Sequence, residues 1–176
     1  VRARLIATEA CRAASNGEAF LARVTDETGL ELEIITRETE ARLAVAGCST
    51  LVDPRAKGVL LFDIGGGSSE LVWIDLTRGP RRDPTRCIRA WASMPLGVVT
   101  LAERHGGRDV TRDVFEGMVD EVNGHLGLLR EGDQLAHHVA RGGIHLLGTS
   151  GTVTTLAGVH LGLKRYDRKR VDGTWL

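Results

Sequence analysis

One stretch constrains the fold of this chain more than any other: a glycine triplet between two apolar runs. Residues 60–74 read Leu-Leu-Phe-Asp-Ile-Gly-Gly-Gly-Ser-Ser-Glu-Leu-Val-Trp-Ile. Both flanks are rich in Leu, Ile, Val, Phe and Trp over strand-like lengths, so they predict two strands joined by a tight hairpin. Gly-rich phosphate loops of the dinucleotide-binding and P-loop kinds lead instead from a strand into a helix. This stretch therefore differs from both of those motifs.

The residues around the triplet favour anion binding over a plain turn. Glycines let the backbone turn tightly and bring several N–H groups within reach of one anion, and Ser68 and Ser69 add hydroxyl donors. Asp63, at the end of the first strand, can hold a cation or orient a water. The alternative is an ordinary hairpin in which the aspartate accepts turn hydrogen bonds. The acid before the glycines and the hydroxyls after them favour a phosphate site.

The composition narrows the class of protein. A length of 176 residues fits one domain or two small lobes. Lys and Arg number 23, as do Asp and Glu, and this balance argues against general nucleic-acid binding but not against a local phosphate site. No apolar run approaches the roughly 20 residues that span a bilayer, so we expect no membrane partner. Three widely separated cysteines fit reduced thiols, which predicts a cytoplasmic protein.

The hydrophobic pattern divides the chain at a polar, turn-rich break over residues 52–58, where we place a lobe boundary. Before it we expect strands over 3–7 and 31–35 and helices over 10–24, broken near Asn16–Gly17, and from an N-cap at Thr36 to about Cys48. After it we expect strands over 58–63, 69–75, 85–93 and 143–148 and helices over 97–105, 111–130 and 151–162. This order predicts an α/β lobe with mixed strand pairing.

Five motifs, in this order and at fitting intervals, resemble the exopolyphosphatase/guanosine-pentaphosphate phosphohydrolase family (Ppx/GppA). They are Ala-Thr-Glu-Ala-Cys-Arg-Ala-Ala-Ser-Asn at 7–16, Glu-Ile-Ile at 33–35 leading to Thr-Glu-Ala-Arg-Leu at 39–43, the glycine loop, Met-Pro-Leu-Gly at 94–97 and Gly-Thr-Ser-Gly-Thr at 148–152. The resemblance implies the actin/hexokinase/Hsp70 fold group, in which two ribonuclease H-like α/β lobes close over a cleft.

The resemblance also implies which part of that fold is present. Residues 1–55 correspond to the C-terminal part of the first actin-like lobe, and residues 56–176 to the second lobe. Family members carry an earlier Asp-x-Gly-Ser-x-Ser-like phosphate loop that nothing here matches. We therefore interpret the chain as an internal fragment that binds phosphate-rich ligands but turns them over poorly alone. The first lobe, reduced to about two strands and their helices, leaves an unpaired sheet edge and exposed apolar surface, which predict a homodimer or self-association through that edge.

Glu40 is where the family's catalytic glutamate falls, so the resemblance implies that it is the general base. Its helix neighbours Leu43, Ala44 and Gly47 predict an apolar face that packs against the fold and partly desolvates the carboxylate. Desolvation raises the pKa of a carboxyl group and helps it accept a proton from water. The alternative is a solvated glutamate or a partner of Arg37 or Arg42.

This segment departs from the family pattern at two positions. The family usually has Ser-Gly-x-Glu-Glu, whereas this chain has Thr-Arg-Glu-Thr-Glu over residues 36–40. Arg37 thus replaces the glycine, and Thr39 replaces the glutamate before the catalytic one. Glu40, the implied base, is retained, but its electrostatic surroundings differ from those in the family.

Asp63 and Glu70 are the candidate ligands of a divalent cation, with Mg²⁺ the implied cofactor. Mg²⁺ prefers one or two carboxylates together with phosphate oxygens. The resemblance also makes Asp63 a catalytic residue that orients the attacking water. For Glu70 an exposed strand residue is an equal alternative. The phosphate-binding residues of the hairpin are Gly65, Gly66, Gly67 and Ser68.

A second candidate phosphate site lies at Thr149, Ser150 and Gly151, which follow an apolar strand and open a helix. Free N–H groups and hydroxyls at a helix N-terminus attract anions. Simple N-capping by Thr149 or Ser150 is the alternative.

Two other polar stretches carry less weight. His137–His138 have no third ligand spaced nearby, so we do not expect a metal there. The basic run at 164–170 can steer polyanions, but a solvated surface segment is the favoured interpretation.

The leading hypothesis is a phosphoanhydride hydrolase that releases terminal phosphate from inorganic polyphosphate or guanosine pentaphosphate. Two alternatives stay open. One is a sugar or acyl kinase of the same fold group, which the Glu-Ala-Arg-Leu motif disfavours. The other is a non-catalytic module that binds polyanions or nucleotides.

Overall fold

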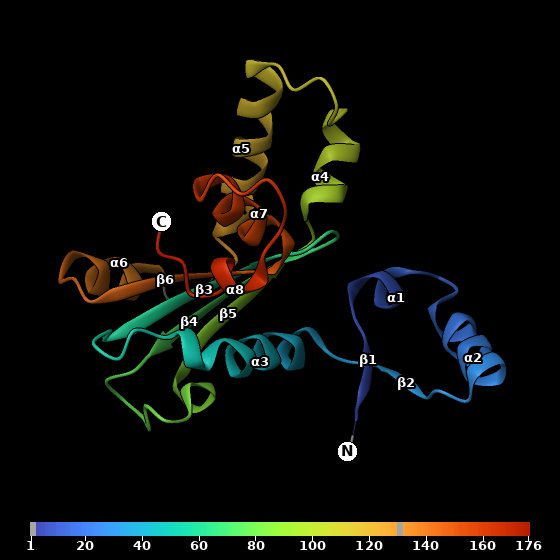
Figure 1. Cartoon of the computed structure of the whole chain (residues 1–176), viewed down its shortest axis with the longest axis horizontal. Helices are drawn as coiled ribbons and strands as arrows, with labels where there is room; N and C mark the ends of the chain where they lie inside the picture. Colours follow the sequence, from blue (N-terminus) through green and yellow to red (C-terminus); the bar gives the residue numbers. More distant parts are fainter. Residues whose placement is uncertain (1–2, 130–131) are drawn as a thin grey trace.

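The computed structural model describes residues 3–129 and 132–176. It contains a two-stranded sheet of order β1-β2 and a four-stranded sheet of order β5-β4-β3-β6 (Figure 1). The first sheet belongs to a small N-terminal part, and a long helix, α3, connects it to the larger sheet. The larger sheet is mixed, as the sequence predicts.

The N-terminal part contains β1 (Leu5–Ala7), α1 (Glu9–Ala13), α2 (Gly17–Thr28) and β2 (Leu32–Ile34). The two strands run parallel, with Leu5 opposite Leu32. The expected break near Asn16–Gly17 is confirmed, because α1 and α2 are separate helices. A Cβ atom on Gly17 would lie 2.0 Å from the carbonyl oxygen of Cys11, so only glycine fits this corner.

Helix α3 (Arg37–Cys48) begins at the expected N-cap, where the Thr36 hydroxyl accepts a hydrogen bond from the Thr39 amide at 3.2 Å. Its buried residues are Ala41, Val45 and Cys48, which share one face at helical spacing. The prediction that Leu43 and Gly47 form the packed face is wrong: Leu43 is 43% exposed and Gly47 faces open space. The helix is rotated so that the neighbouring stripe meets the sheet.

The larger sheet is a three-stranded antiparallel meander with one parallel strand added. The meander comprises β3 (Gly58–Ile64), β4 (Ser69–Asp75) and β5 (Ile88–Met94), and β6 (Ile144–Thr149) runs parallel to β3. Val59, Leu61, Val72 and Ile74 are almost fully buried and pack in one cluster with the buried face of α3. Alternate strand residues therefore point toward α3.

The remaining helices lie before, between and after the strands of the larger sheet. They are η1 (Ser49–Leu51), η2 (Pro84–Cys87), α4 (Val98–His105), α5 (Arg112–Leu126), α6 (Gly132–Ala140), α7 (Ser150–His160) and α8 (Arg168–Val171). The helix expected over 111–130 ends at Leu126, and residue 130 lies outside the described residues. Helix α6 was not predicted.

Helices α3 and α7 lie on opposite sides of the sheet (Figure 1). A Cβ atom on Gly148 would lie 2.6 Å from the Phe62 ring and 2.7 Å from a Val153 methyl group of α7. Phe62 alternates with the core residues that face α3, so α7 covers the other face. Within residues 3–129 and 132–176, the structure contains no helix that combines the length and apolarity a membrane span requires.

Candidate functional site

The glycine triplet forms the expected hairpin turn between β3 and β4. The Gly65 amide donates to the carbonyl of Ser68 at 3.0 Å, and Ile64 pairs with Ser69 at the start of the ladder. In the described part of the chain, the amides of Gly66, Gly67 and Ser68 donate no hydrogen bond. Those amides are therefore available to an anionic ligand.

The first turn of α4 fixes the carbonyl side of this loop. The Val98 amide donates to the Gly65 carbonyl and the Val99 amide to the Gly66 carbonyl, each at 3.0 Å. A Cβ atom on Gly97 would lie 2.4 Å from the Gly65 oxygen, so the two backbones touch directly. The Met-Pro-Leu-Gly segment thus holds the glycine loop in place.

Four polar side chains form a row across the sheet beside the loop. Asp63 pairs with Glu70 on β4 and with Thr149 on β6, and Glu70 pairs with Ser93 on β5. Directly opposed residues lie on the same face, with Cβ atoms about 4.5–5.5 Å apart in antiparallel pairs. Asp63 lies two residues after Leu61 and four after Val59 on β3, so it shares their face, and the row continues the α3 face of the sheet to its loop end.

Glu70 is buried, with 4% of its surface exposed, so the alternative of an exposed strand residue is wrong. The Ser93 hydroxyl donates to its carboxylate at 2.9 Å. Burial raises the pKa of Glu70, and hydrogen bonds from Ser68 and Ser93 oppose that rise. Sequence reasoning missed Ser93, because only the strand register brings it to Glu70.

The opposed carboxylates of Asp63 and Glu70 form a donor pair that suits a hard divalent cation. Among the residues that the structure describes, no three His, Cys, Asp or Glu side chains converge on one point. A Mg²⁺ ion held there would therefore take its further ligands from water or substrate oxygens, which is its usual manner of binding near phosphates.

Glu40 lies beside this row on α3 and pairs with an arginine of the N-terminal part. Arg12 Nη2 lies 3.0 Å from Glu40 Oε2, and Arg12 Nη1 donates to the Ile35 carbonyl at 2.6 Å. The suggested partners Arg37 and Arg42 bind other carboxylates. Arg12 was not singled out from the sequence, although it is the only cation in its motif.

Glu9 brings helix α1 against the glycine loop. A Cβ atom on Gly67 would lie 3.7 Å from Glu9 Cγ. The Glu9 carboxylate binds Arg37 and Arg12 at 2.9 and 2.7 Å, and hydrogen bonds from Arg37, then from Arg12, hold its pKa below the usual range despite partial burial. The N-terminal part and the sheet therefore meet at one site.

The β6–α7 junction faces the same loop. The Thr152 hydroxyl donates to the Ile64 carbonyl at 3.4 Å, which ties α7 to the end of β3. Thr149 occupies the N-cap position without a side-chain capping bond, so its hydroxyl does not serve the simple N-cap role. Ser150 has a φ of 78°, a left-handed conformation that is rare for a residue other than glycine.

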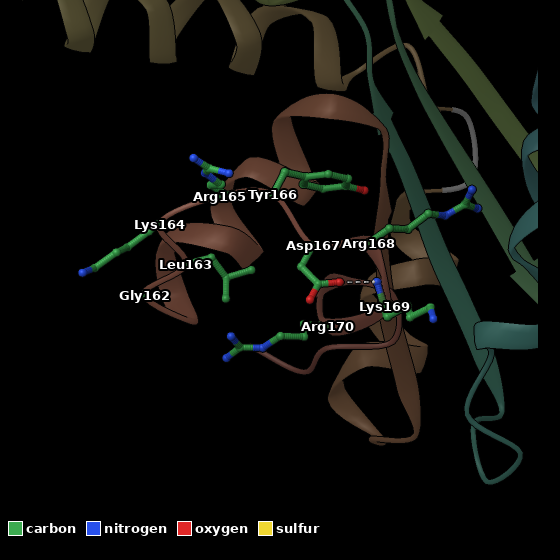
Figure 2. Close-up of a pocket in the computed structure, with 9 residues that line it drawn as sticks. All are labelled: Gly162, Leu163, Lys164, Arg165, Tyr166, Asp167, Arg168, Lys169 and Arg170. Atoms are coloured by element: carbon green, nitrogen blue, oxygen red, sulfur yellow. Dashed lines mark hydrogen bonds between the residues drawn. The ribbon is translucent and has the colours of Figure 1, made fainter.

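The basic run is separate from these residues. Residues 162–170 line a hollow of about 900 Å³. Figure 2 shows that the side chains of Lys164, Arg165 and Arg170 point away from one another. Arg168 pairs with Asp172 at 3.0 Å, and Asp167 accepts from the Lys169 amide at 3.1 Å. Divergent cations agree with the favoured interpretation of a solvated surface segment.

Nearly the whole chain is similar to known proteins. A model of the Ppx/GppA phosphatase family matches residues 1–172. The guanosine-5'-triphosphate,3'-diphosphate pyrophosphatase of Photobacterium profundum is 30% identical over 161 residues, which are 91% of this chain and 29% of that protein.

Solved structures agree. An exopolyphosphatase-like protein shares 31% identity and a TM-score of 0.74, over 94% of this chain and 50% of that one. The Aquifex aeolicus member of the Ppx/GppA family shares 30% identity and a TM-score of 0.67, over 97% of this chain and 49% of that one. The chain thus spans about half the length of these solved relatives.

These matches and the mixed sheet confirm the fold that the five motifs imply. The family model covers the N-terminal part, α3 and the sheet alike. The chain belongs to the Ppx/GppA phosphatase family.

Proposed function

We propose that this chain contributes one wall of the active site of a phosphoanhydride hydrolase, whose substrate is inorganic polyphosphate or guanosine pentaphosphate. The observation that carries the proposal is the meeting of Glu40, Asp63 and Glu70 beside unbonded glycine-loop amides. Paired carboxylates next to an amide cradle can activate water and hold a phosphoryl group at once.

Each group has a distinct role in this proposal. Amides of the glycine loop and of the β6–α7 junction bind phosphoryl oxygens, and Glu40 takes a proton from the attacking water. Asp63 orients that water. Asp63 and Glu70 would hold Mg²⁺, which neutralises charge on the phosphoryl group when it is bound. Positioning and charge neutralisation supply most of the rate in phosphoryl transfer.

The relatives support both substrate classes. One solved relative is named an exopolyphosphatase-like protein, and the curated relative acts on a guanosine nucleotide by its name. An assay that supplies polyphosphate and guanosine pentaphosphate together, and measures the phosphate released from each, assigns the substrate preference.

Glu40→Gln tests the proposal in the protein that carries this chain. It removes the base but keeps the size and hydrogen-bonding capacity of the side chain, so phosphate release falls by about 10²–10⁴-fold while substrate binding remains. Glu38→Gln is the matched control, because Glu38 pairs with Arg42 on the exposed side of the same helix. A loss of less than tenfold for Glu40→Gln removes this residue from the role of base.

The same assay separates the alternatives. Binding of polyphosphate without release by the unaltered protein supports a non-catalytic module. Transfer of phosphate from ATP to a sugar or an acyl acceptor supports a kinase instead.

A further inference from the structure

Arg37, the first residue of α3, lies at the solvent end of the site. Its guanidinium contacts both oxygens of the Glu9 carboxylate: Nη2 lies 2.9 Å from Oε1, and Nε lies 3.2 Å from Oε2. Two-point contacts of this kind fix the orientation of a carboxylate as well as its charge. The Arg37 side chain is 43% exposed and that of Glu9 only 15%, so Arg37 holds a largely shielded carboxylate from outside.

Glu9 in turn shares Arg12 with Glu40. Arg12 Nη2 lies 2.7 Å from Glu9 Oε2 and 3.0 Å from Glu40 Oε2, and Arg12 Nε adds a contact of 3.1 Å to Glu9. The four side chains form a run of alternating charge from the surface to the candidate base. We call Arg37, Glu9, Arg12 and Glu40 the charge chain.

We propose that Arg37 is a positioning residue of the candidate active site, acting through Glu9 to keep Arg12 on Glu40. The proposal rests on the proposed function, because it assigns to Arg37 a part in holding the base. Glu9 and Glu40 share Arg12 Nη2, which carries two N–H groups, and Arg37 holds Glu9 in the orientation that leaves one of them to Glu40. Without Arg37, Glu9 is free to turn fully onto Arg12 and draw it from Glu40. Interactions in such shielded networks depend on every member.

The charge balance leads to a second consequence. Two cations and two anions make the charge chain neutral, and loss of Arg37 leaves one excess negative charge. Glu9 sits next to the glycine loop, since its Cγ is 3.7 Å from where a Gly67 Cβ would be. Excess negative charge at that place opposes the binding of a phosphate anion. Arg37 therefore affects both substrate affinity and the placement of the base.

These two effects respond differently to Arg37→Lys. Lysine keeps the positive charge but loses the planar two-point contact. We expect Arg37→Ala to raise KM and to lower kcat by about tenfold or more, because misplacement of a catalytic group by about 1 Å can cost about 10²-fold. Arg37→Lys restores KM and leaves kcat low. A purely structural role for Arg37 would not separate the two constants.

The experiment, in the protein that carries this chain, measures phosphate release from polyphosphate for Arg37→Ala, Arg37→Lys, Glu9→Gln and the Arg37→Ala/Glu9→Gln double variant. Arg42→Ala is the matched control, because Arg42 pairs with exposed Glu38 at 3.2 Å on the same helix. If Arg37 acts through Glu9, then Arg37→Ala causes little further loss of kcat in the Glu9→Gln background. An equal loss in both backgrounds, or an Arg37→Ala variant that behaves like Arg42→Ala, overturns the proposal.

A readout without turnover separates this inference from the proposed function. Absence of phosphate release by the unaltered protein refutes the function, but the Nε–H resonance of Arg12 still reports the charge chain. We expect Arg37→Ala to shift that resonance and Arg42→Ala to leave it in place. An Arg12 resonance that is identical in the unaltered protein and in Arg37→Ala refutes the role of Arg37, whatever the protein hydrolyses.

Discussion

Ser150 is the described non-glycine residue with a positive φ, and it opens α7 at the candidate site. A left-handed conformation costs a residue with a Cβ atom about 1–2 kcal/mol. Such strain persists where surrounding structure enforces it, and it clusters at functional sites.

Two substitutions at this position separate strain from hydroxyl chemistry. Ser150→Ala keeps the strain and removes the hydroxyl, whereas Ser150→Gly removes both. We expect the glycine variant to unfold with a free energy about 1 kcal/mol higher than the alanine variant, because glycine tolerates the positive φ. If the hydroxyl binds phosphate, both variants lose affinity equally. If urea titrations show that the glycine variant is less stable than the alanine variant, the backbone of Ser150 is not strained.

His145 links stability to pH. Its Nδ1 accepts a hydrogen bond from the Asp53 amide at 3.1 Å, and its ring stacks on Trp175 with centroids 4.7 Å apart. Burial lowers the pKa of His145, and the nearby charge of Asp53 opposes that shift. The unfolded chain therefore binds the proton more readily than the folded chain does.

The sign of the pH effect follows from that difference. The stabilisation is complete above the unfolded pKa of about 6.5 and is lost as pH falls through the lower folded pKa. His145→Asn, whose side-chain oxygen can still accept from Asp53, does not titrate. The free energy of unfolding, measured at intervals from pH 7 downward, declines more steeply for the unaltered chain than for this variant. Parallel curves would rule out His145 as the source.

At the scale of elements, Gly97, the N-cap residue of α4, packs directly against the backbone of the glycine loop and leaves no room for a side chain. A Cβ atom on Gly97 would lie 2.4 Å from the Gly65 oxygen and 2.5 Å from the Gly66 carbon and oxygen, all backbone atoms. Gly97→Ala must therefore displace the loop, at a cost of about 1–3 kcal/mol, the usual range for overpacking.

Gly124→Ala provides the matched control, because Gly124 lies inside α5 with nothing near its Cβ position. Alanine there stabilises the helix by about 0.5–1 kcal/mol. We expect Gly97→Ala to weaken the binding of phosphate ligands and to lower the melting temperature, while Gly124→Ala raises it. Unchanged ligand affinity in Gly97→Ala would show that α4 does not hold the loop.

The sequence predicts most of these elements because their signals are local. Apolar runs of strand-like length predict β3 and β4 nearly to their ends, and the Thr36 N-cap marks the start of α3. The strand expected over 85–93 begins later, at Ile88, because Pro84 opens a short helical turn.

The parts of the site that depend on tertiary pairing were not predictable. Ser93 reaches Glu70 only through the register of β4 and β5, and Arg12 reaches Glu40 across 28 positions of sequence. The predicted buried face of α3 was wrong at Leu43 and Gly47 for the same reason. Two stripes of apolar or small residues run along the helix, and only packing against the sheet decides which one is buried. The functional roles of the motif residues were inferred from the resemblance to the family.

At the scale of the whole molecule, the candidate site lies where the N-terminal part, α3 and the larger sheet meet. Helix α1 supplies Glu9 and Arg12, α3 supplies Glu40, and the sheet supplies Asp63 and Glu70. The N-terminal part is thus tied to α3 by two ion pairs, Arg12 with Glu40 and Glu9 with Arg37, whose carboxylates are largely shielded from solvent. Removal of one partner of such a pair leaves an uncompensated charge and destabilises both sides of the junction.

The surface of the described chain carries large apolar side chains on the elements around β6. Leu146 is 63% exposed, and on α7 Leu156 is 56% and Val159 73% exposed. Exposed apolar side chains that gather in one region of a surface mark contact sites or promote association. Strand β6 also lies at an end of the strand order β5-β4-β3-β6, and an edge strand can pair with another chain.

We therefore expect this chain to self-associate in a concentration-dependent manner through β6 and α7, a different surface from the first-lobe edge that the sequence analysis names. Sedimentation velocity over a range of concentrations measures the association. A variant with Leu146→Lys and Val159→Lys should associate more weakly, because two charges replace apolar contacts and guard the edge strand. The control carries Ser15→Lys and Thr50→Lys, which add the same charge at exposed polar positions outside β6 and α7. If both variants weaken association equally, net charge and not this apolar surface governs it, and a chain that is monomeric at every concentration excludes the surface as a contact site for a second copy.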